Sequence, residues 1–142
     1  MTPQEIAERS AQAMWANDKA SRALGMELVE VAPGYAQMTM TIRRDMLNGQ
    51  DIGHGGLIFT LADSTFAFAC NTYNQKVVAQ NCGVTFHAPA MEGDVLTATG
   101  TEVTRAGRSG LYDIFVKRAD GTLVASFRGH SRTVPGTHFE AD

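Results

Sequence analysis

The chain has 142 residues, with 12 Lys and Arg against 15 Asp and Glu, and a formal net charge of −3. We expect one domain, residues 1–142, that buries about two thirds of the surface its unfolded chain exposes. The mildly acidic balance excludes a general attraction to nucleic acid or to membrane surfaces, so we expect neither as a partner.

The first residues predict a helix rather than an export signal. Thr2 suits an N-cap and Pro3 the first helical position, so a helix is expected to about Asn17. Acidic side chains and the lack of an apolar core argue against a signal peptide. Asp18 can cap a second, short turn that ends at Gly25.

A hairpin is expected next. Met26–Val31 alternates as a strand, Pro33-Gly34 indicates a turn, and Tyr35–Ile42 alternates again with its methionines on one face. The hairpin leads into a loop that spans residues 43–53.

The loop ends in His54-Gly55-Gly56, which opens the most unusual stretch of the chain. Glycines cost helix stability, and here they leave bare the free N–H groups of a helix N-terminus, which attract negative charge. An exposed N–H donor beside Asn48 and His54 is a candidate oxyanion site.

A helix over about residues 55–72 follows, and it is apolar on every side, as helices inside a fold or a membrane are. It is shorter than the ~18–20 apolar residues of a membrane span and is interrupted by Asp63, Ser64 and Thr65, so the interior of a domain is expected. An ionised group there is costly unless it is paired or used. Asp63 is therefore a candidate catalytic residue, and a buried ion pair with an arginine is the structural alternative.

The rest of the chain predicts strands rich in Val, Thr, Phe and Tyr, joined by glycine-containing turns: Lys76–His87, Asp94–Thr104, Ser109–Lys117 and Leu123–Thr133. The tail from about residue 135 is expected to be loose. Strands that follow one buried helix indicate an α+β fold with the helix on one face of an antiparallel sheet, although the pattern does not choose among such layouts.

The pattern of Asn48, His54-Gly55-Gly56 and Leu61-Ala62-Asp63 resembles the hotdog-fold acyl-CoA thioesterases, most closely the PaaI type of phenylacetic acid degradation. The similarity extends from Asn17-Asp18 to Phe127-Arg128-Gly129. It implies a twisted antiparallel sheet wrapped around the central helix, without a cofactor. It also implies an acyl-CoA substrate, with phenylacetyl-CoA or a hydroxylated phenylacetyl-CoA as the best expectation.

Spacing along the helix predicts a homodimer. Gly55 and Asp63 are eight residues apart, about 12 Å along a helix axis at 1.5 Å per residue. A base or nucleophile and the oxyanion donors must both lie about 3 Å from the reacting centre, so one helix cannot supply both to one site. Two antiparallel copies can share two sites, as the family resemblance also implies, together with assembly into tetramers.

The resemblance implies roles for these residues in thioester hydrolysis. The Gly55 N–H stabilises the oxyanion, Asn48 supports the loop or reaches the substrate, and His54 orients or polarises the thioester. Asp63 of the partner chain attacks directly or activates water, and the sequence does not separate the two. Ser64 and Thr65 either position water or bond back to the preceding helical turn.

Coenzyme A needs cations for its phosphates. Arg105 and Arg108 flank a glycine turn, and His130 and Arg132 lie on the last strand, although turn arginines are often only solvated. The expected substrate-binding set is completed by Gly56, Thr65 and Ser109. Two further groups are candidates for the acyl pocket: Asn81, Thr85 and His87 on one strand face, and the aromatic residues Phe59, Phe66, Phe68 and Phe86.

Two other functions compete with hydrolysis: a hotdog hydratase or dehydratase, and a non-catalytic acyl-CoA-binding module that has little use for a buried carboxylate. Zinc catalysis and nucleophilic serine chemistry are not expected, because the histidines show no paired spacing and no Gly-x-Ser-x-Gly occurs. Cys70 and Cys82 lack metal-ligand spacing, so we expect free thiols in a reducing cytoplasm.

Overall fold

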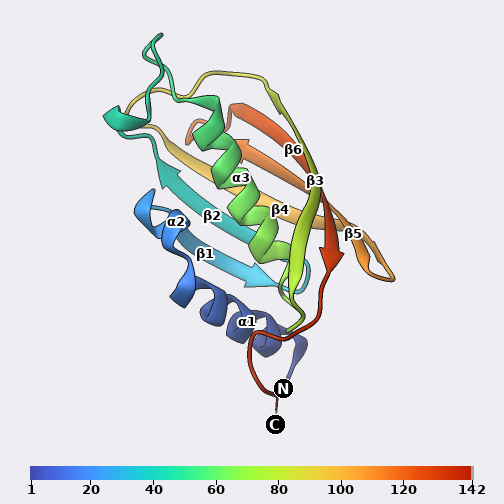
Figure 1. Ribbon diagram of the computed structural model, residues 1–142. Helices are drawn as coiled ribbons and strands as arrows, with labels where there is room; N and C mark the ends of the chain where they lie inside the picture. The colour runs from blue at the N-terminus through green and yellow to red at the C-terminus, as the bar shows by residue number, and fades with distance from the viewer. Residues whose placement is uncertain (142) are drawn as a thin grey trace.

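The structure is a computed structural model that describes residues 1–141 (Figure 1). Two helices lead into a hairpin, a short 3-10 turn and the long helix: α1 (Pro3–Asn17), α2 (Lys19–Ala23), β1 (Glu27–Ala32), β2 (Tyr35–Thr41), η1 (Arg44–Met46) and α3 (Gly55–Cys70). The remaining strands are β3 (Val77–Phe86), β4 (Val95–Ala106), β5 (Ser109–Lys117) and β6 (Leu123–Thr133).

All six strands form one antiparallel sheet in the order β1-β2-β4-β5-β6-β3. Figure 1 shows α3 lying across the inner face of this twisted sheet. This is the α+β hotdog arrangement, so the expected fold is confirmed. The strand order leaves β1 and β3 at the two edges, and β3 runs beside α3 with one side unpaired within residues 1–141.

Small residues in the sheet let α3 approach it closely. A Cβ on Gly129 of β6 would lie 2.7 Å from carbons of the Phe66 ring, and one on Gly100 of β4 would lie 3.3 Å from the Thr65 methyl. Phe66 is fully buried with the other side chains that fill the space between helix and sheet, such as Leu61 and Met38. The sheet therefore fixes the rotation of α3 about its axis.

The helix caps agree with the predictions. Thr2 Oγ1 accepts a hydrogen bond from Glu5 N at 3.1 Å, while Glu5 Oε1 accepts one from Thr2 N at 3.4 Å. Asp18 caps α2 by accepting from Ser21 N at 2.9 Å. The long helix ends at Cys70, two residues before the expected position, because Asn71 takes the C-cap and its Nδ2 donates to the Ala67 carbonyl at 2.8 Å.

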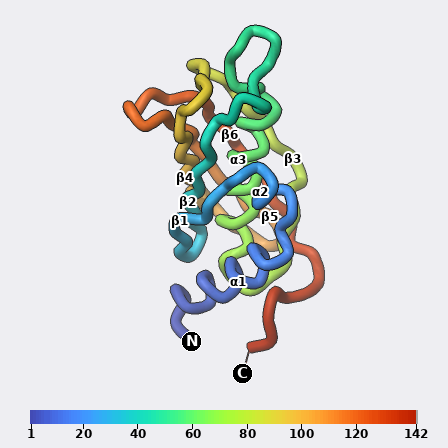
Figure 2. Tube along the Cα trace, turned by 90° about the vertical axis from the view of Figure 1, so that its left-hand side faces the viewer, coloured from blue at the N-terminus to red at the C-terminus, as the bar shows by residue number. Residues whose placement is uncertain are grey.

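Part of the tail that was expected to be loose from about residue 135 makes defined contacts with the rest of the chain. Asn74, whose φ is +53°, accepts hydrogen bonds on its side-chain oxygen from the N–H groups of His138 and Phe139 at 2.9 and 3.1 Å. Arg9 of α1 stacks on the Phe139 ring at 4.4 Å, and Figure 2 shows the tail beside α1 at one end of the molecule. The groups that hold the tail lie far away in the sequence, so its own composition could not reveal them.

Candidate active site

The start of α3 is held by backbone hydrogen bonds. His54 N donates to the Met46 carbonyl at 2.8 Å, and Gly53 N donates to the Ala90 carbonyl at 2.7 Å. His54 is the N-cap, and its Nδ1 accepts from Gly56 N at 3.0 Å. Gly55 N has no acceptor within residues 1–141. The N–H of Gly56 is therefore occupied, whereas the N–H of Gly55, the expected oxyanion donor, is free to bind a ligand.

Asn48 organises the loop before α3. Its side-chain oxygen accepts from Gln50 N at 2.9 Å and from Ile52 N at 3.4 Å, and its own N–H donates to the Ile52 carbonyl at 2.8 Å. Of the two expected roles, support of the loop is visible in these contacts. Its Nδ2 atom has no acceptor in the described part of the chain and can still donate to a ligand.

Asp63 lies two turns further along α3 and is half-buried. Within residues 1–141 its carboxylate accepts no hydrogen bond and forms no ion pair, so the structural alternative of a buried pair with an arginine is not observed. Burial raises the pKa of Asp63. Burial raises the pKa of the Cys82 thiol on β3, and the charge of Asp63 raises it further.

The hydroxyls of the two residues after Asp63 form hydrogen bonds with groups other than its carboxylate. Ser64 Oγ is 2.8 Å from Ser21 Oγ, which itself lies 2.7 Å from a carboxylate oxygen of Asp18. Thr65 is fully buried and donates to the Leu61 carbonyl at 2.8 Å. Of the two alternatives expected for the Thr65 hydroxyl, the bond back to the preceding helical turn is the one observed, and the Thr65 methyl packs on the sheet.

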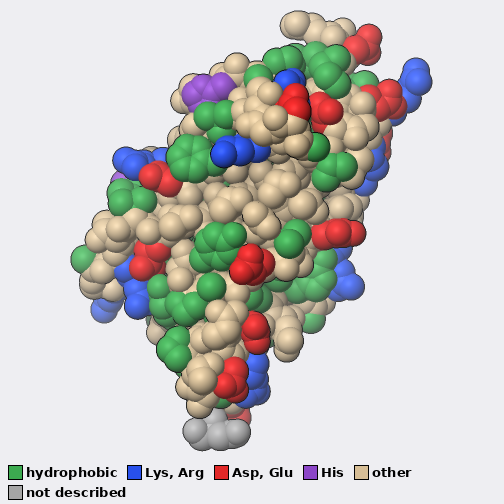
Figure 3. All heavy atoms as spheres, turned by 180° about the vertical axis from the view of Figure 1, so that it is seen from behind, with side chains coloured by type: hydrophobic (Ala, Val, Ile, Leu, Met, Phe, Trp, Pro, Cys, Tyr) green, Lys and Arg blue, Asp and Glu red, His purple; other side chains and the backbone are tan. Residues whose placement is uncertain are grey.

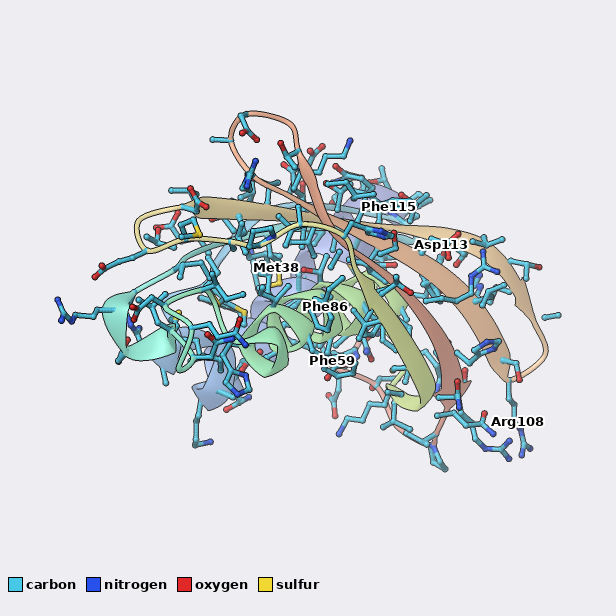
Figure 4. All side chains as sticks on the ribbon, turned by 90° about the horizontal axis from the view of Figure 1, so that it is seen from above. Met38, Phe59, Phe86, Arg108, Asp113 and Phe115 are labelled. Atoms are coloured by element: carbon cyan, nitrogen blue, oxygen red, sulfur yellow. The ribbon has the colours of Figure 1, made fainter. Side chains whose placement is uncertain are left out.

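A cavity of about 400 Å³ adjoins the start of α3. It is lined by the loop before the helix, by the helix start and by the end of β3 with the segment that follows: Asn48, Ile52, Gly53, Gly55, Ile58, Phe86, His87, Ala88 and Pro89. Figure 4 shows Phe86 on the α3 side of the sheet. Oxyanion donor and cavity thus lie side by side.

Two of the three strand-face candidates point away from α3, whereas His87 lines the cavity at its start. Along β3, Cys82 and Val84 are half-buried toward the core, so Asn81 and Thr85, which flank this pair, are exposed on the opposite face. His87 Nε2 is 2.8 Å from Ser126 Oγ. Among the aromatic candidates, Phe66 and Phe68 are core residues, whereas Phe86 is exposed.

The cationic candidates gather at the other end of the molecule. Arg132 pairs with Ser109 across β5 and β6, and Thr133 N donates to the Arg108 carbonyl at 2.8 Å. His130 and Arg132 are exposed next to the first half of β3, and Figure 4 shows Arg108 far from Phe86. Arg105 does not join them, since its guanidinium stacks on Tyr73. The structure therefore does not support the expected phosphate contact of Arg105.

The expected site residues thus form three separate groups in one chain: Asn48, His54, Gly55 and Gly56 at the helix start, Asp63 in the middle, and Arg108, Ser109, His130 and Arg132 at the far end. The straight helix maintains the separation of about 12 Å between Gly55 and Asp63. The position of Phe86 against Gly55 gives no signal in the sequence, because the two are distant along the chain.

Some features are absent from the part of the chain that the structure describes. None of its helices combines the length and apolar character that a membrane crossing needs. No three His, Cys, Asp or Glu side chains among residues 1–141 lie close enough to hold a metal ion together.

Comparison with known proteins agrees with this geometry. Residues 51–125 match the family model described as the thioesterase superfamily. The acyl-coenzyme A thioesterase PaaI of Escherichia coli K12 is 40% identical over 129 residues, which cover 91% of this chain and 92% of that protein.

Two solved structures show the same likeness. The E. coli PaaI protein from the phenylacetic acid degradation operon superposes with a TM-score of 0.94 at 39% identity, covering 96% of this chain and 99% of that chain. A mutant of the phenylacetic acid degradation protein PaaI from Thermus thermophilus superposes with a TM-score of 0.79 at 34% identity. The match covers 82% of this chain and 100% of that chain. The chain therefore belongs to the thioesterase superfamily and is a hotdog-fold thioester hydrolase of the PaaI type.

Proposed function

We propose that this acyl-CoA thioesterase hydrolyses aryl-acetyl thioesters of coenzyme A, with phenylacetyl-CoA or a hydroxylated phenylacetyl-CoA as substrate. The observation that carries the proposal is one helix that presents two groups of complementary chemistry, the N–H of Gly55 and the carboxylate of Asp63, neither of which has a partner within residues 1–141. The relatives support the aryl-acetyl group, since their names place them in phenylacetic acid degradation. The free thiols Cys70 and Cys82 fit a cytoplasmic location.

A homodimer would complete the site. The unpaired edge of β3 offers ten residues for antiparallel pairing with a second copy about a two-fold axis. Each α3 lies beside its own β3, so such pairing would place the two α3 helices side by side and antiparallel. The Gly55 N–H of one chain would then approach Asp63 of the other, which resolves the separation of about 12 Å within one helix.

The same pairing accounts for the cationic group. The last residue of β3, Phe86, lies at Gly55, and the first, Val77, pairs with Thr133 close to Arg132 and Arg108. Antiparallel pairing places the start of one β3 opposite the end of the other. Arg108, His130 and Arg132 of one chain would therefore lie near the helix start of its partner, where they suit the phosphates of coenzyme A.

A tetramer is the further assembly that we propose. Figure 3 shows the face of the sheet that α3 leaves uncovered, with hydrophobic groups scattered among charged ones. Phe115 on this face is 46% exposed, and Arg128 Nε donates to Asp113 Oδ1 nearby at 2.6 Å. This face is available for contact between two dimers.

The proposed reaction uses each group once. The thioester carbonyl oxygen accepts from Gly55 N–H, and the positive end of the α3 dipole stabilises the oxyanion that forms. Because His54 Nδ1 already accepts from Gly56, the proton of its neutral ring is on Nε2, from which it can donate to the thioester. Asp63 of the partner either takes a proton from a water that adds to the carbonyl, or attacks the carbonyl itself to form an acyl-enzyme anhydride. The C–S bond then breaks, and the CoA thiolate leaves and takes up a proton. In the second route water hydrolyses the anhydride, which releases the acid and restores the carboxylate.

Hydrolysis by wild-type protein and by Asp63→Asn tests the proposal. Release of free CoA thiol from phenylacetyl-CoA is the readout, and thermal midpoint on the same preparation is the control for folding. Loss of the charge is expected to cut kcat by about 10²-fold or more with KM little changed, without loss of folding. The proposal is overturned if Asp63→Asn keeps full activity, or if the wild-type protein releases no CoA.

A further inference from the structure

Phe86 is placed against the proposed oxyanion donor. A Cβ built on Gly55 would lie 3.0 Å from Phe86 Cζ, 3.3 Å from Cε2 and 3.5 Å from Cε1, so the tip of the ring meets the first residue of α3. The side chain is nevertheless 48% exposed. A large aromatic ring thus combines a fixed contact at the reactive helix end with an open face.

The backbone around Phe86 is held on both sides. Phe86 pairs with Ala125 of β6, and the next residue, His87, donates its N–H to the Val124 carbonyl at 2.7 Å. Ala90, beyond Pro89, accepts from Gly53 N at 2.7 Å, which ties the segment after β3 to the loop before α3. The ring is therefore presented by a fixed strand end, and a site whose parts are fixed in advance loses less free energy on binding.

The cavity beside the ring is largely apolar. Ile52, Ile58, Ala88 and Pro89 line it together with Phe86, and Gly55 opens into it. Its volume of about 400 Å³ falls in the range of small-molecule sites. A carbonyl oxygen bonded to Gly55 N–H would place the attached acyl group next to this wall.

The other three aromatic candidates pack against aromatic rings of the protein itself. Phe59 packs edge-on against Phe127 with ring centroids 5.2 Å apart, and Phe66 packs between Phe127 and Tyr112 at 5.8 and 5.7 Å. Phe68 is fully buried and contacts Trp15 at 6.1 Å. Of these four rings, Phe86 alone has a largely exposed surface at the helix start.

We propose that Phe86 selects the acyl group, its ring forming the wall against which a flat aryl-acetyl group packs in preference to a flexible alkyl chain of similar length. This inference rests on the proposed function and names the residue that would set its substrate class. Aromatic pairs gain stabilisation beyond the area they bury, which corresponds to roughly 3- to 10-fold in selectivity. A leucine retains apolar bulk and loses this term.

The test compares kcat/KM for phenylacetyl-CoA and hexanoyl-CoA in four proteins: wild type, Phe86→Leu, Phe86→Ala and Phe115→Ala. Phe115 is the matched control, because it is 46% exposed and lies on the opposite face of the sheet (Figure 4). Phe86→Leu is expected to lower the aryl-to-alkyl ratio roughly 3- to 10-fold, and Phe115→Ala to leave it unchanged. A ratio that Phe86→Leu leaves unchanged, with both substrates affected equally, overturns the inference.

A binding measurement separates this inference from the proposed function. S-phenethyl-CoA and S-hexyl-CoA, in which a methylene replaces the carbonyl, cannot be hydrolysed and are titrated by calorimetry. A wild-type preference for the phenethyl compound that Phe86→Leu removes supports the role of Phe86 even if no thioester is hydrolysed. Equal affinities of the wild type, or a preference that survives in Phe86→Leu, defeat that role even if hydrolysis is confirmed.

Discussion

The guanidinium carbon of Arg105 lies 3.5 Å from the centroid of the Tyr73 ring. The hydroxyls of Tyr73 and of the buried Tyr112 both donate to Oε1 of Glu102, at 2.9 and 2.8 Å, and Arg105 Nε is 3.9 Å from the same oxygen. This cluster joins the turn after α3 to β4 and β5. Arg105 thus stacks on protein, whereas the neighbouring Arg108 projects from the hairpin.

The two arginines are expected to differ in their effects. Arg108→Ala should raise KM for acyl-CoA with kcat nearly unchanged, as for loss of uniform binding, and matter less for a pantetheine thioester that lacks the nucleotide phosphates. Arg105→Ala should leave KM unchanged and cost about 0.5–1 kcal/mol of stability, the scale of an exposed cation–π contact. Steady-state kinetics and urea unfolding check both, and a larger KM effect at Arg105 would reverse the assignment.

Gly55 allows removal of a single backbone N–H. Proline is well tolerated at the first helical position, and the preceding His54 has the extended backbone that proline favours (φ −63°, ψ 127°). Gly55→Pro is expected to lower kcat by about 10²–10³-fold, as for loss of an oxyanion donor. Gly55→Ala is the control: it introduces the same Cβ contact with Phe86 and keeps the N–H. Equal losses in both variants would show that crowding, and not the donor, matters.

The raised pKa of Asp63 predicts opposite pH effects on activity and stability. Burial raises this pKa above its ordinary 3.8, and catalysis needs the ionised form. The acid limb of kcat/KM is therefore expected to have its midpoint above 3.8. For stability, a raised pKa means that the native state binds the Asp63 proton more tightly than the unfolded state does. Burial of the charged carboxylate therefore lowers the free energy of unfolding at pH values above the pKa of Asp63 in the folded state. This loss of stability disappears as the pH falls through that pKa.

Asp63→Asn removes this cost at every pH. The variant is expected to be more stable than wild type near neutral pH, with the difference shrinking toward acid, where Asp63 is protonated in both states. Urea unfolding at a series of pH values measures this difference. A gap that widens toward acid would mean that the native structure favours the ionised carboxylate.

Close approach of α3 to the sheet depends on Gly129. Gly129→Ala would place a methyl group 2.7 Å from the Phe66 ring, and overpacking of this kind costs about 1–3 kcal/mol. Gly83→Ala on the adjacent strand is the control, since a Cβ there meets nothing within 4 Å. Chemical denaturation is expected to show a loss for the first variant only, and equal losses would point to a general intolerance of alanine in these strands.

The sequence predicts local structure well because local signals determine it. Thr2 and Asp18 cap the helices as expected, and the alternation of Met38 and Met40 with polar neighbours predicts which face of β2 is buried. The position of β3 at the edge of the sheet follows from pairing with distant β6, for which no local signal exists. The contact of Phe66 with Gly129 is invisible for the same reason.

The sequence likewise predicts some residues of the candidate site and not others. Asp63 and Gly55 stand out in the sequence because a lone carboxylate in an apolar helix and paired glycines at its start are both costly. The substrate contacts expected of Thr65 and Arg105 are not visible, because Thr65 bonds to the Leu61 carbonyl and Arg105 stacks on Tyr73. Residue type alone does not distinguish a ligand contact from an internal one.

The sharing of one site by two chains is tested most directly by mixing two inactive variants. Asp63→Asn and Gly55→Pro are co-expressed so that subunits assemble at random, and CoA release is compared with each variant alone. About half of the pairs are then mixed, and each mixed pair has one site with neither substitution, so about a quarter of wild-type activity is expected. A mixture that contains mixed pairs, shown by two different affinity tags, and yet stays as inactive as its components would contradict the shared site.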